Sequence, residues 1–243
     1  MLQYGLAPAV ENGGNAGVPE TGTIPAKYNT SKSARDLHEK HGRRGWGGAR
    51  NTADRTSDAV TLHQAAGVIR AAEVAWAIGL PLNRHVTIHL EKAGVADRDA
   101  AKAIGAFLRM MRDWLRKAGL MTAGAWVREN GLGKGSHVHI LLHLPTGVRW
   151  TFQRCRRWLE RIVGVPYRKG VIVTRRIRGS ARPDQMLDLY SANLAKIVMY
   201  LIKGVQACDA KMLGIQHYRP GGTVIGKRVG WTQNIGSGSA LQL

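Results

Sequence analysis

Residues 121–144, MTAGAWVRENGLGKGSHVHILLHL, contain the pattern that decides the fold. Apolar residues dominate both ends of this stretch, and a glycine-rich segment at 130–136, NGLGKGS, separates the two ends. Glycine and asparagine between two apolar runs are typical of a turn that joins two strands. The stretch therefore predicts a β-hairpin, with strands over Met121–Glu129 and His137–Leu144.

Helical and alternating periodicities continue on both sides of this hairpin. The other predicted elements are, in chain order, a helix over Ser57–Ile78, a strand over Arg84–Glu91, a helix over Asp97–Ala118, a helix over Thr151–Val163, a strand over Gly170–Arg178 and a helix over Pro183–Lys203. From residue 84 the order is β-α-β-β-α-β-α. This order predicts an α+β fold, with an antiparallel sheet and helices on one face in a split βαβ or ferredoxin-like arrangement, plus an N-terminal helix.

Composition sets the limits of the folded part. The first 56 residues are rich in glycine, asparagine and arginine, and they predict a flexible segment because such residues bury little apolar surface. Residues 57–210 are expected to form the main domain, with its core in 80–205, and residues 211–243 a flexible tail. No run reaches the roughly 18–20 apolar residues of a membrane helix, and two cysteines are too few for a disulfide framework. We expect a cytoplasmic protein without a membrane partner.

Charge indicates a polyanionic partner. Lys and Arg total 36 against 16 Asp and Glu, which gives a formal net charge of +20. Six arginines within the basic segment 149–182 are candidate contacts to DNA phosphates: Arg154, Arg157 and Arg161 on one stripe of a predicted helix, and Arg175, Arg176 and Arg178 on the strand that follows. Two alternatives stay open. The net charge also fits a ribosome-like or nonspecific DNA coat protein, and the arginine cluster also fits a merely solvated face.

Three residues of the hairpin favour a metal site. His137 and His139 occupy alternate positions of one strand, so both imidazoles point to the same face of the sheet. If the turn is centred on Gly133, Glu129 pairs with His137 and joins that face. Two imidazoles and a carboxylate suit Mg²⁺ or Mn²⁺ acting on a phosphate. In the alternative, a register shifted by one residue turns Glu129 to the other face, and the histidines are ordinary polar residues of a sheet.

The last predicted helix contains a candidate nucleophile. Tyr200 and Lys203 lie three residues apart, and Lys196 lies four residues before Tyr200, so helical spacing places the three side chains on nearly the same face. A phenol with cations nearby is an activated nucleophile. The alternative is an interfacial tyrosine beside a solvated lysine.

The order of these motifs resembles the HUH endonuclease superfamily, in particular the one-tyrosine rolling-circle replication initiators of plasmids and single-stranded DNA phages. The family's early-strand motif is matched by His85–Glu91, HVTIHLE, its HUH motif by His137–His139, and its Tyr-x-x-Lys motif by Tyr200–Lys203. The predicted order of helices and strands also matches. The resemblance covers roughly residues 80–205 and leaves the N-terminal part and the C-terminal tail unexplained.

The resemblance implies that the protein nicks single-stranded DNA at a replication origin. Two histidines and an acidic residue would hold a divalent cation against the scissile phosphate. Tyr200 would become linked to the 5′-phosphate and free a 3′-OH that primes synthesis, with Lys203 stabilising charge. The covalent link would allow rejoining without ATP, and a host helicase and polymerase would act with the protein.

The sequence lacks two features that some members of the superfamily have, a second tyrosine on the last helix and a Walker phosphate loop. Two-tyrosine members carry a second tyrosine near the first, but here Tyr190 lies ten residues before Tyr200 and is expected to be structural. Residues 133–136, GKGS, break the order of a Walker phosphate loop, so no fused helicase is expected. His89 and His143 are interpreted as sheet histidines, and a supplementary place in the metal site stays open for both.

Other functional classes stay open at this point. A relaxase or a transposase of the same superfamily would share the chemistry, although Tyr4, the candidate for a relaxase nucleophile, lies in a segment that predicts disorder. A two-histidine phosphoesterase would need a second His-x-Thr element besides His85–Thr87, and a histidine-triad hydrolase would need a histidine at Leu141. A non-enzymatic nucleic-acid-binding protein explains the charge and leaves the histidine and tyrosine motifs without a role.

Overall fold

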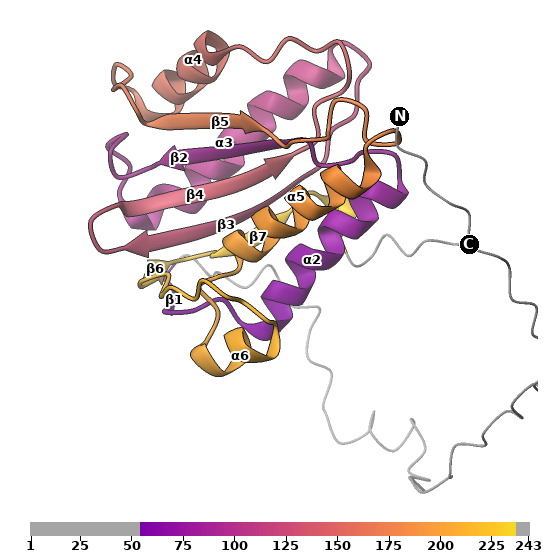
Figure 1. Ribbon diagram of the computed structural model, residues 1–243. Helices are drawn as coiled ribbons and strands as arrows, with labels where there is room; N and C mark the ends of the chain where they lie inside the picture. The colour runs from indigo at the N-terminus through magenta and orange to yellow at the C-terminus, as the bar shows by residue number, and fades with distance from the viewer. Residues whose placement is uncertain (1–53, 237–243) are drawn as a thin grey trace, which may run out of the picture. The chain divides into compact units, whose positions relative to one another are not determined.

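The computed structural model describes residues 54–236 of the 243-residue chain. Nearly all of the predicted flexible segment 1–56, Tyr4 included, therefore lies outside the described residues, as do residues 237–243. The described part has an α+β fold built on an antiparallel sheet of five strands (Figure 1), which confirms the predicted fold class.

The strands of the sheet lie in the order β5-β2-β4-β3-β7, and each neighbouring pair is antiparallel. Their bounds are Arg84–His89 for β2, Gly124–Gly131 for β3, Gly135–Leu142 for β4, Ile172–Arg176 for β5 and Val229–Trp231 for β7. In this order β4 separates β2 from β3, and β2 separates β4 from β5. Both crossovers are therefore split βαβ units, as the order of the predicted elements indicated.

The β3–β4 hairpin has the predicted register. Glu129 pairs with His137, and Val127 pairs with His139. The strands extend further toward the tip than predicted, because Gly131 still pairs with Gly135. Gly135 itself has a φ of +60°, a conformation that favours glycine, so the hairpin depends on this residue type.

Helices cover both faces of the sheet (Figure 1). The bounds are Leu62–Ala77 for α2, Asp97–Arg116 for α3, Phe152–Val163 for α4, Leu187–Leu201 for α5 and Ala207–Met212 for α6. The expected packing on one face holds for α3 and α4, which bury Val138 and Ile140 of β4. It does not hold for α5, which packs with α2 on the opposite face over Val127 and Leu141. The central strands β3 and β4 carry apolar residues on both faces of the sheet, so both faces need helices that cover them. No helix among residues 54–236 is long and apolar enough to cross a lipid bilayer.

α2 begins later than the sequence analysis placed it. Thr61 is its N-cap: the Thr61 hydroxyl accepts a hydrogen bond from the Gln64 backbone N–H, and the Gln64 side chain accepts one from the Thr61 N–H. This reciprocal capping box stabilises the first turn. The preceding residues Thr56–Ser57 form β1, which pairs with Val224–Ile225, β6.

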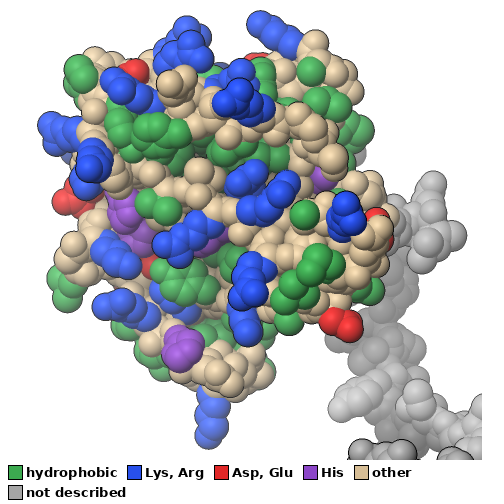
Figure 2. Space-filling model, turned by 45° about the horizontal axis from the view of Figure 1, so that its top comes forward, with side chains coloured by type: hydrophobic (Ala, Val, Ile, Leu, Met, Phe, Trp, Pro, Cys, Tyr) green, Lys and Arg blue, Asp and Glu red, His purple; other side chains and the backbone are tan. Residues whose placement is uncertain are grey.

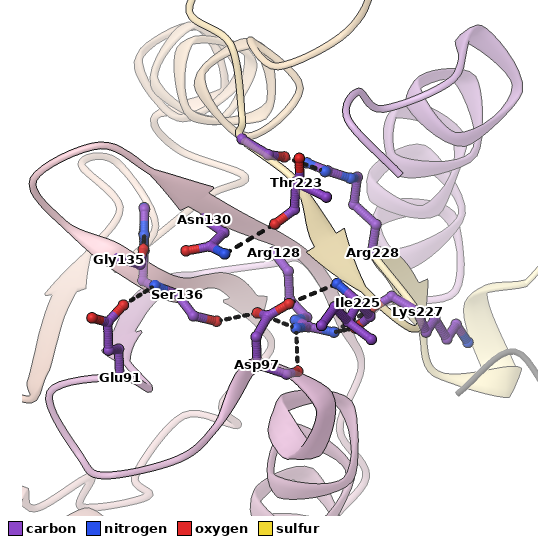
Figure 3. A network of polar contacts seen from close by, with 12 residues as sticks. Glu91, Asp97, Arg128, Asn130, Gly135, Ser136, Thr223, Ile225, Lys227 and Arg228 are labelled. Carbon is purple, nitrogen blue, oxygen red and sulfur yellow. Dashed lines mark hydrogen bonds and ion pairs between the residues drawn. The ribbon is translucent and has the colours of Figure 1, made fainter. Parts of the chain in front are cut away.

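The C-terminal segment corrects a prediction. The sequence predicts a flexible tail from residue 211, whereas the structure continues through α6, β6 and β7 to a short 3-10 helix over Gln233–Ile235. Two buried arginines fix the segment (Figure 3): Arg128 donates to the carbonyls of Ile225 and Lys227, and Arg228 donates to the carbonyl of Gly222. The glycines that suggested flexibility instead permit close packing. A Cβ on Gly230 would lie 2.6 Å from the Trp126 ring.

Candidate active site

Three neighbouring strands bring a row of polar side chains to the sheet face that α5 covers. Glu129 on β3 lies opposite His137 on β4, and Thr87 on β2 lies opposite His139. His85 shares the face of Thr87 because side chains alternate along a strand. Glu129, His137 and His139 are buried, whereas Thr87 and His85 are half-buried.

Glu129, His137 and His139 form a buried cluster that can hold a metal ion. One possible ligand atom from each residue lies within 4.8 Å of the other two. The three residues are 6%, 3% and 4% exposed. The hairpin register alone thus brings together the three ligands that the sequence predicts.

The hydrogen bonds of His137 prepare one nitrogen for a metal. Its Nδ1 lies 2.8 Å from the Gly135 carbonyl oxygen, which can only accept a hydrogen bond. In a neutral ring the proton is then on Nδ1, and Nε2 carries a lone pair. Nε2 lies 3.4 Å from a Glu129 carboxylate oxygen, also an acceptor. A protonated ring donates a hydrogen bond from Nε2 to Glu129, whereas in the neutral ring the Nε2 lone pair and the carboxylate can bind one cation between them. A backbone bond to the far nitrogen is typical of metal-bound histidine.

His139 is oriented from its other side. Its Nδ1 lies 3.0 Å from the Thr87 hydroxyl and 3.3 Å from His85 Nε2. Its Nε2 is buried and has no hydrogen-bond partner among the described residues. An unpaired buried polar atom costs free energy, and a bound cation would remove that cost. Burial, the largest cause, lowers the pKa of His139 to about 2, so the ring is neutral and can donate its lone pair.

Glu129 is ionised and held by two partners. Burial alone would raise the pKa of its carboxyl, but the hydrogen bond with His137 and the Lys203 ammonium lower that pKa to about 2. Lys203 donates to one carboxylate oxygen of Glu129, and His137 faces the other. Lys203 and Glu129 are 74 residues apart in the chain, so their pairing is a product of the fold.

Tyr200 faces this cluster from the last turn of α5. Its ring centroid lies 5.0 Å from that of His139 and 6.4 Å from that of His85, both edge to face. The residue is 39% exposed, so its hydroxyl is open to a ligand. Burial and the negative charge of Glu129 raise the pKa of the phenol, whereas Arg219 opposes this shift. The phenol is therefore protonated at neutral pH and needs added positive charge to ionise.

Lys203 lies close to Tyr200, but not on the same helix as the sequence analysis expected. The helix ends at Leu201, and Lys203 lies in the turn that follows, beyond the C-cap Ile202. The Nζ atom of Lys203 nevertheless lies 4.1 Å from the centroid of the Tyr200 ring. Lys203 thus contacts Tyr200 and Glu129 together and links the nucleophile candidate to the metal-binding cluster.

A hollow of about 500 Å³ opens in front of these residues, and we call it the site hollow. Its lining includes His137, His139, Tyr200, Arg175 and Lys196. Figure 2 shows histidine side chains gathered on one face of the molecule, with Lys and Arg side chains around them. Two cationic side chains beside a metal-binding cluster suit an anionic ligand such as a phosphodiester.

The six predicted DNA-contacting arginines do not lie together. Arg175 pairs with His85 and lines the site hollow. Arg176, the next residue of β5, points to the opposite face of the sheet. Arg154, Arg157 and Arg161 lie on α4, which packs on that opposite face, and the Arg154 guanidinium lies 3.9 Å above the centroid of the Trp114 ring. Arg178 is exposed beyond the end of β5.

The remaining predicted residues have the structural roles that the sequence indicated, with one exception. Tyr190 is buried and donates a hydrogen bond of 2.8 Å to the Leu82 carbonyl. His143 is buried, and its Nδ1 lies 2.8 Å from the Pro81 carbonyl. His89 is the exception: its ring stacks on His137 at 5.6 Å, at the edge of the site hollow.

Two contributions to the site were not among the predicted site residues. Thr87 and His85 orient His139, and their alternate spacing in the first strand is the signal that places them on its face. Arg219 comes from the C-terminal segment: its backbone N–H donates to the Lys203 carbonyl, and its charge acts on Tyr200. No local pattern indicates that a residue of the glycine-rich C-terminal segment lies beside the site.

Comparison with known proteins does not assign the chain to a family. No protein-family model matches it, and no curated protein and no solved structure matches it significantly. The functional argument therefore depends on the geometry and charge of the site.

Proposed function

We propose that this protein is a metal-dependent DNA nicking and joining endonuclease of the HUH type, which initiates rolling-circle replication. The observation that carries the proposal is the position of Tyr200, whose ring lies 5.0 Å from that of His139 at the edge of the Glu129–His137–His139 cluster. A tyrosine in this position is placed to attack a phosphate held by the cluster. The order of motifs in the sequence supports the same function.

The proposed reaction is a transesterification at one DNA phosphate. The Tyr200 oxygen attacks phosphorus and forms an ester bond, while the bond from phosphorus to the 3′ oxygen of the preceding nucleotide breaks. The phenol gives up its proton and the 3′ oxygen takes up a proton, so a 5′-phosphotyrosine and a free 3′-OH result. The reverse reaction rejoins the strand without ATP. A divalent cation, Mg²⁺ or Mn²⁺, supplies charge neutralisation at the phosphoryl oxygens when bound.

Each protein group has a defined part in this reaction. Glu129, His137 and His139 would hold the cation, and the contacts of the His139 Nδ1 with Thr87 and His85 keep the His139 ring in position. Lys203 holds positive charge beside the phenol, whose raised pKa otherwise disfavours ionisation.

The shape and charge of the site hollow support single-stranded DNA as the substrate. Arg175 and Lys196 line the same hollow as Tyr200, where they can contact phosphates on both sides of the scissile bond. A single strand at a replication origin exposes a phosphate that can enter such a hollow. A cytoplasmic setting, with a host helicase and polymerase that extend the freed 3′-OH, completes the proposal.

The decisive experiment is a search for the covalent adduct. Purified protein is mixed with labelled single-stranded origin DNA and Mn²⁺, denatured, and examined for a DNA-linked band. Mass spectrometry after nuclease digestion then identifies the modified peptide. We expect the nucleotide on Tyr200, loss of the adduct in Tyr200→Phe, and slower cleavage with the adduct retained in Lys203→Ala. A nucleotide on any other residue, or cleavage that persists in EDTA, contradicts the proposal.

Variants of the cluster test the metal separately from the chemistry. His139→Ala removes the nitrogen that lacks a partner, and we expect it to abolish both nicking and Mn²⁺ binding measured by calorimetry. Glu129→Gln keeps the shape but removes the charge, so a higher Mn²⁺ concentration should be required. His63→Ala, an exposed histidine on α2, is the matched control and should behave as the wild type.

Three further candidates are separated by the same assays. A relaxase or transposase would share the adduct and differ in the DNA sequence that it nicks. A two-histidine phosphoesterase is favoured by His85 and Thr87 on the site face, but it would cleave without any DNA-linked intermediate. A non-enzymatic nucleic-acid-binding protein would bind DNA and leave it uncut.

A further inference from the structure

A second hollow lies beside the site hollow, at the tip of the β3–β4 hairpin. It has a volume of about 730 Å³, within the range of ligand sites, and we call it the hairpin hollow. The turn residues Leu132 and Lys134 form one side of it, and Lys92, in the turn after β2, forms another. None of the predicted motifs accounts for this hollow.

The two hollows adjoin each other. His89 and Lys134 line both of them, so a ligand that leaves the site hollow past these residues enters the hairpin hollow. His89 presents an aromatic ring at this boundary, stacked on His137 with an interplanar angle of 26°. A chain molecule that extends beyond the metal-binding cluster would therefore pass over an aromatic surface and then a cationic one.

In the hairpin hollow the acidic side chain is held by a hydrogen bond, whereas two lysine side chains form no ion pair. The one acidic side chain that lines it, Glu91, is engaged: its carboxylate accepts a hydrogen bond of 3.0 Å from the Ser136 backbone, and Ser136 in turn donates to Asp97 (Figure 3). Neither Lys92 nor Lys134 forms an ion pair with any residue of the described range. Both ammonium groups are available to an anion.

A glycine and an exposed leucine form further parts of the wall of the hairpin hollow. Gly170, on its wall, has a φ of +83°, and a Cβ there would lie 2.9 Å from the Lys92 ammonium nitrogen. At the tip, Leu132 is 103% exposed and contributes an apolar surface that the fold leaves uncovered. An apolar side chain and two lysines on one hollow match a nucleotide, which has a flat base and a charged phosphate.

We propose that the hairpin hollow is a nucleotide subsite of the same single strand whose scissile phosphate lies at Tyr200. This inference rests on the proposed function. Lys92 and Lys134 bind a phosphate that flanks the scissile one. Leu132 packs against the base of the same nucleotide, which is turned away from the neighbouring bases of the strand. The hairpin thereby holds the strand on one side of the scissile bond and fixes the register in which it crosses the cluster.

The test is a length series of thymidine oligonucleotides, with affinity measured by fluorescence anisotropy in EDTA at constant ionic strength. For the wild type, affinity should rise steeply once the strand is long enough to reach the second hollow. In Lys92→Ala/Leu132→Ser, that step should vanish. Affinity for long strands should fall about tenfold, because one phosphate contact and one apolar contact with a base are lost together, while affinity for short strands is unchanged. Both substituted side chains are exposed, so the melting temperature should stay that of the wild type.

Lys117→Ala is the matched control. It removes the same charge from the C-terminal end of α3, the end opposite Asp97, and should leave the length step intact. The inference is overturned if the double variant keeps the length step, or if its affinity falls equally at every length. Because these measurements use no Mn²⁺ and no cleavage, they are independent of the adduct assay. A wild-type protein that forms no adduct contradicts the proposed nicking, whatever the length series shows.

Discussion

Tyr190 and Tyr200 lie on the same helix, and their surroundings separate a structural phenol from a reactive one. Tyr190 is 1% exposed, and its hydroxyl bonds the Leu82 carbonyl. Tyr190→Phe leaves that carbonyl buried and unpaired, so we expect a loss of about 1–3 kcal/mol in the free energy of unfolding, measured with urea. The DNA adduct should still form. Tyr200→Phe should give the reverse pattern, with stability kept and adduct lost.

Residue-scale electrostatics also predict how stability depends on pH. Burial is the largest cause that lowers the pKa of His139 to about 2 and that of His85 to about 4, from 6.5 in an unfolded chain. Between these values and pH 6.5 the unfolded state binds more protons than the folded state, so acid favours unfolding. In EDTA the free energy of unfolding should therefore fall as the pH drops below about 6.5.

His139→Asn checks this assignment, because it removes one buried titrating ring while keeping a polar side chain. Urea unfolding at several pH values between 7.5 and 5 should give a shallower slope for this variant than for the wild type. His63→Asn, on the exposed surface of α2, should leave the slope unchanged. Equal slopes for the wild type and His139→Asn would mean that this ring does not titrate between the two states.

At the scale of elements, β5 and α4 divide the basic residues between two faces of the sheet. Arg175 lines the site hollow, whereas Arg154, Arg157 and Arg161 lie on the helix that packs on the other face. With a short single strand, Arg175→Ala should make the negative slope of log affinity against log salt shallower by about 0.7, the value of one lost phosphate contact. The triple α4 variant should leave that slope unchanged, and an equal loss would show that DNA also contacts α4.

A substitution on the last strand, β7, tests whether the C-terminal segment is part of the folded domain. A Cβ on Gly230 would lie 2.6 Å from the Trp126 ring, so Gly230→Ala forces β7 and β3 apart. The free energy of unfolding should fall by about 1–3 kcal/mol.

Gly105, within α3, has open space where its Cβ would be. Gly105→Ala should stabilise the protein by about 0.5–1 kcal/mol, because alanine loses less freedom in a helix. Thermal and urea unfolding measure both changes.

These elements also show what a sequence can predict. The hairpin register was predictable because alternation has a period of two and the glycine turn fixes its centre, and with it came the Glu129–His137–His139 cluster. The pairing of Lys203 with Glu129 was not, because it depends on how α5 lies across the sheet. The same holds for the α4 arginines: helical spacing places them on one stripe, but only tertiary packing decides which face of the sheet that stripe joins.

The C-terminal segment escaped prediction for a different physical reason. β6 and β7 contain two and three residues, too few for the alternation of a strand to appear in the sequence. Glycine predicts flexibility as long as the group that packs against it is unknown. The partners here are distant: the Asn130 carbonyl occupies the space of a Cβ on Gly222, and Arg128 bonds the backbone of Ile225. Close backbone approach explains the glycines once the fold is known.

For the whole molecule, the net charge of +20 acts over a longer range than the site. If a strand contacts four to six phosphates, the slope of log affinity against log salt should be about −3 to −4. This term is independent of the cation that the cluster holds, because it comes from the excess of lysines and arginines over acidic residues and not from the cluster. Binding should therefore persist in EDTA with nearly the same slope, while nicking stops. Fluorescence anisotropy and gel assays on one oligonucleotide separate the two. Affinity that collapses in EDTA would mean instead that the cation bridges protein and DNA in the ground state.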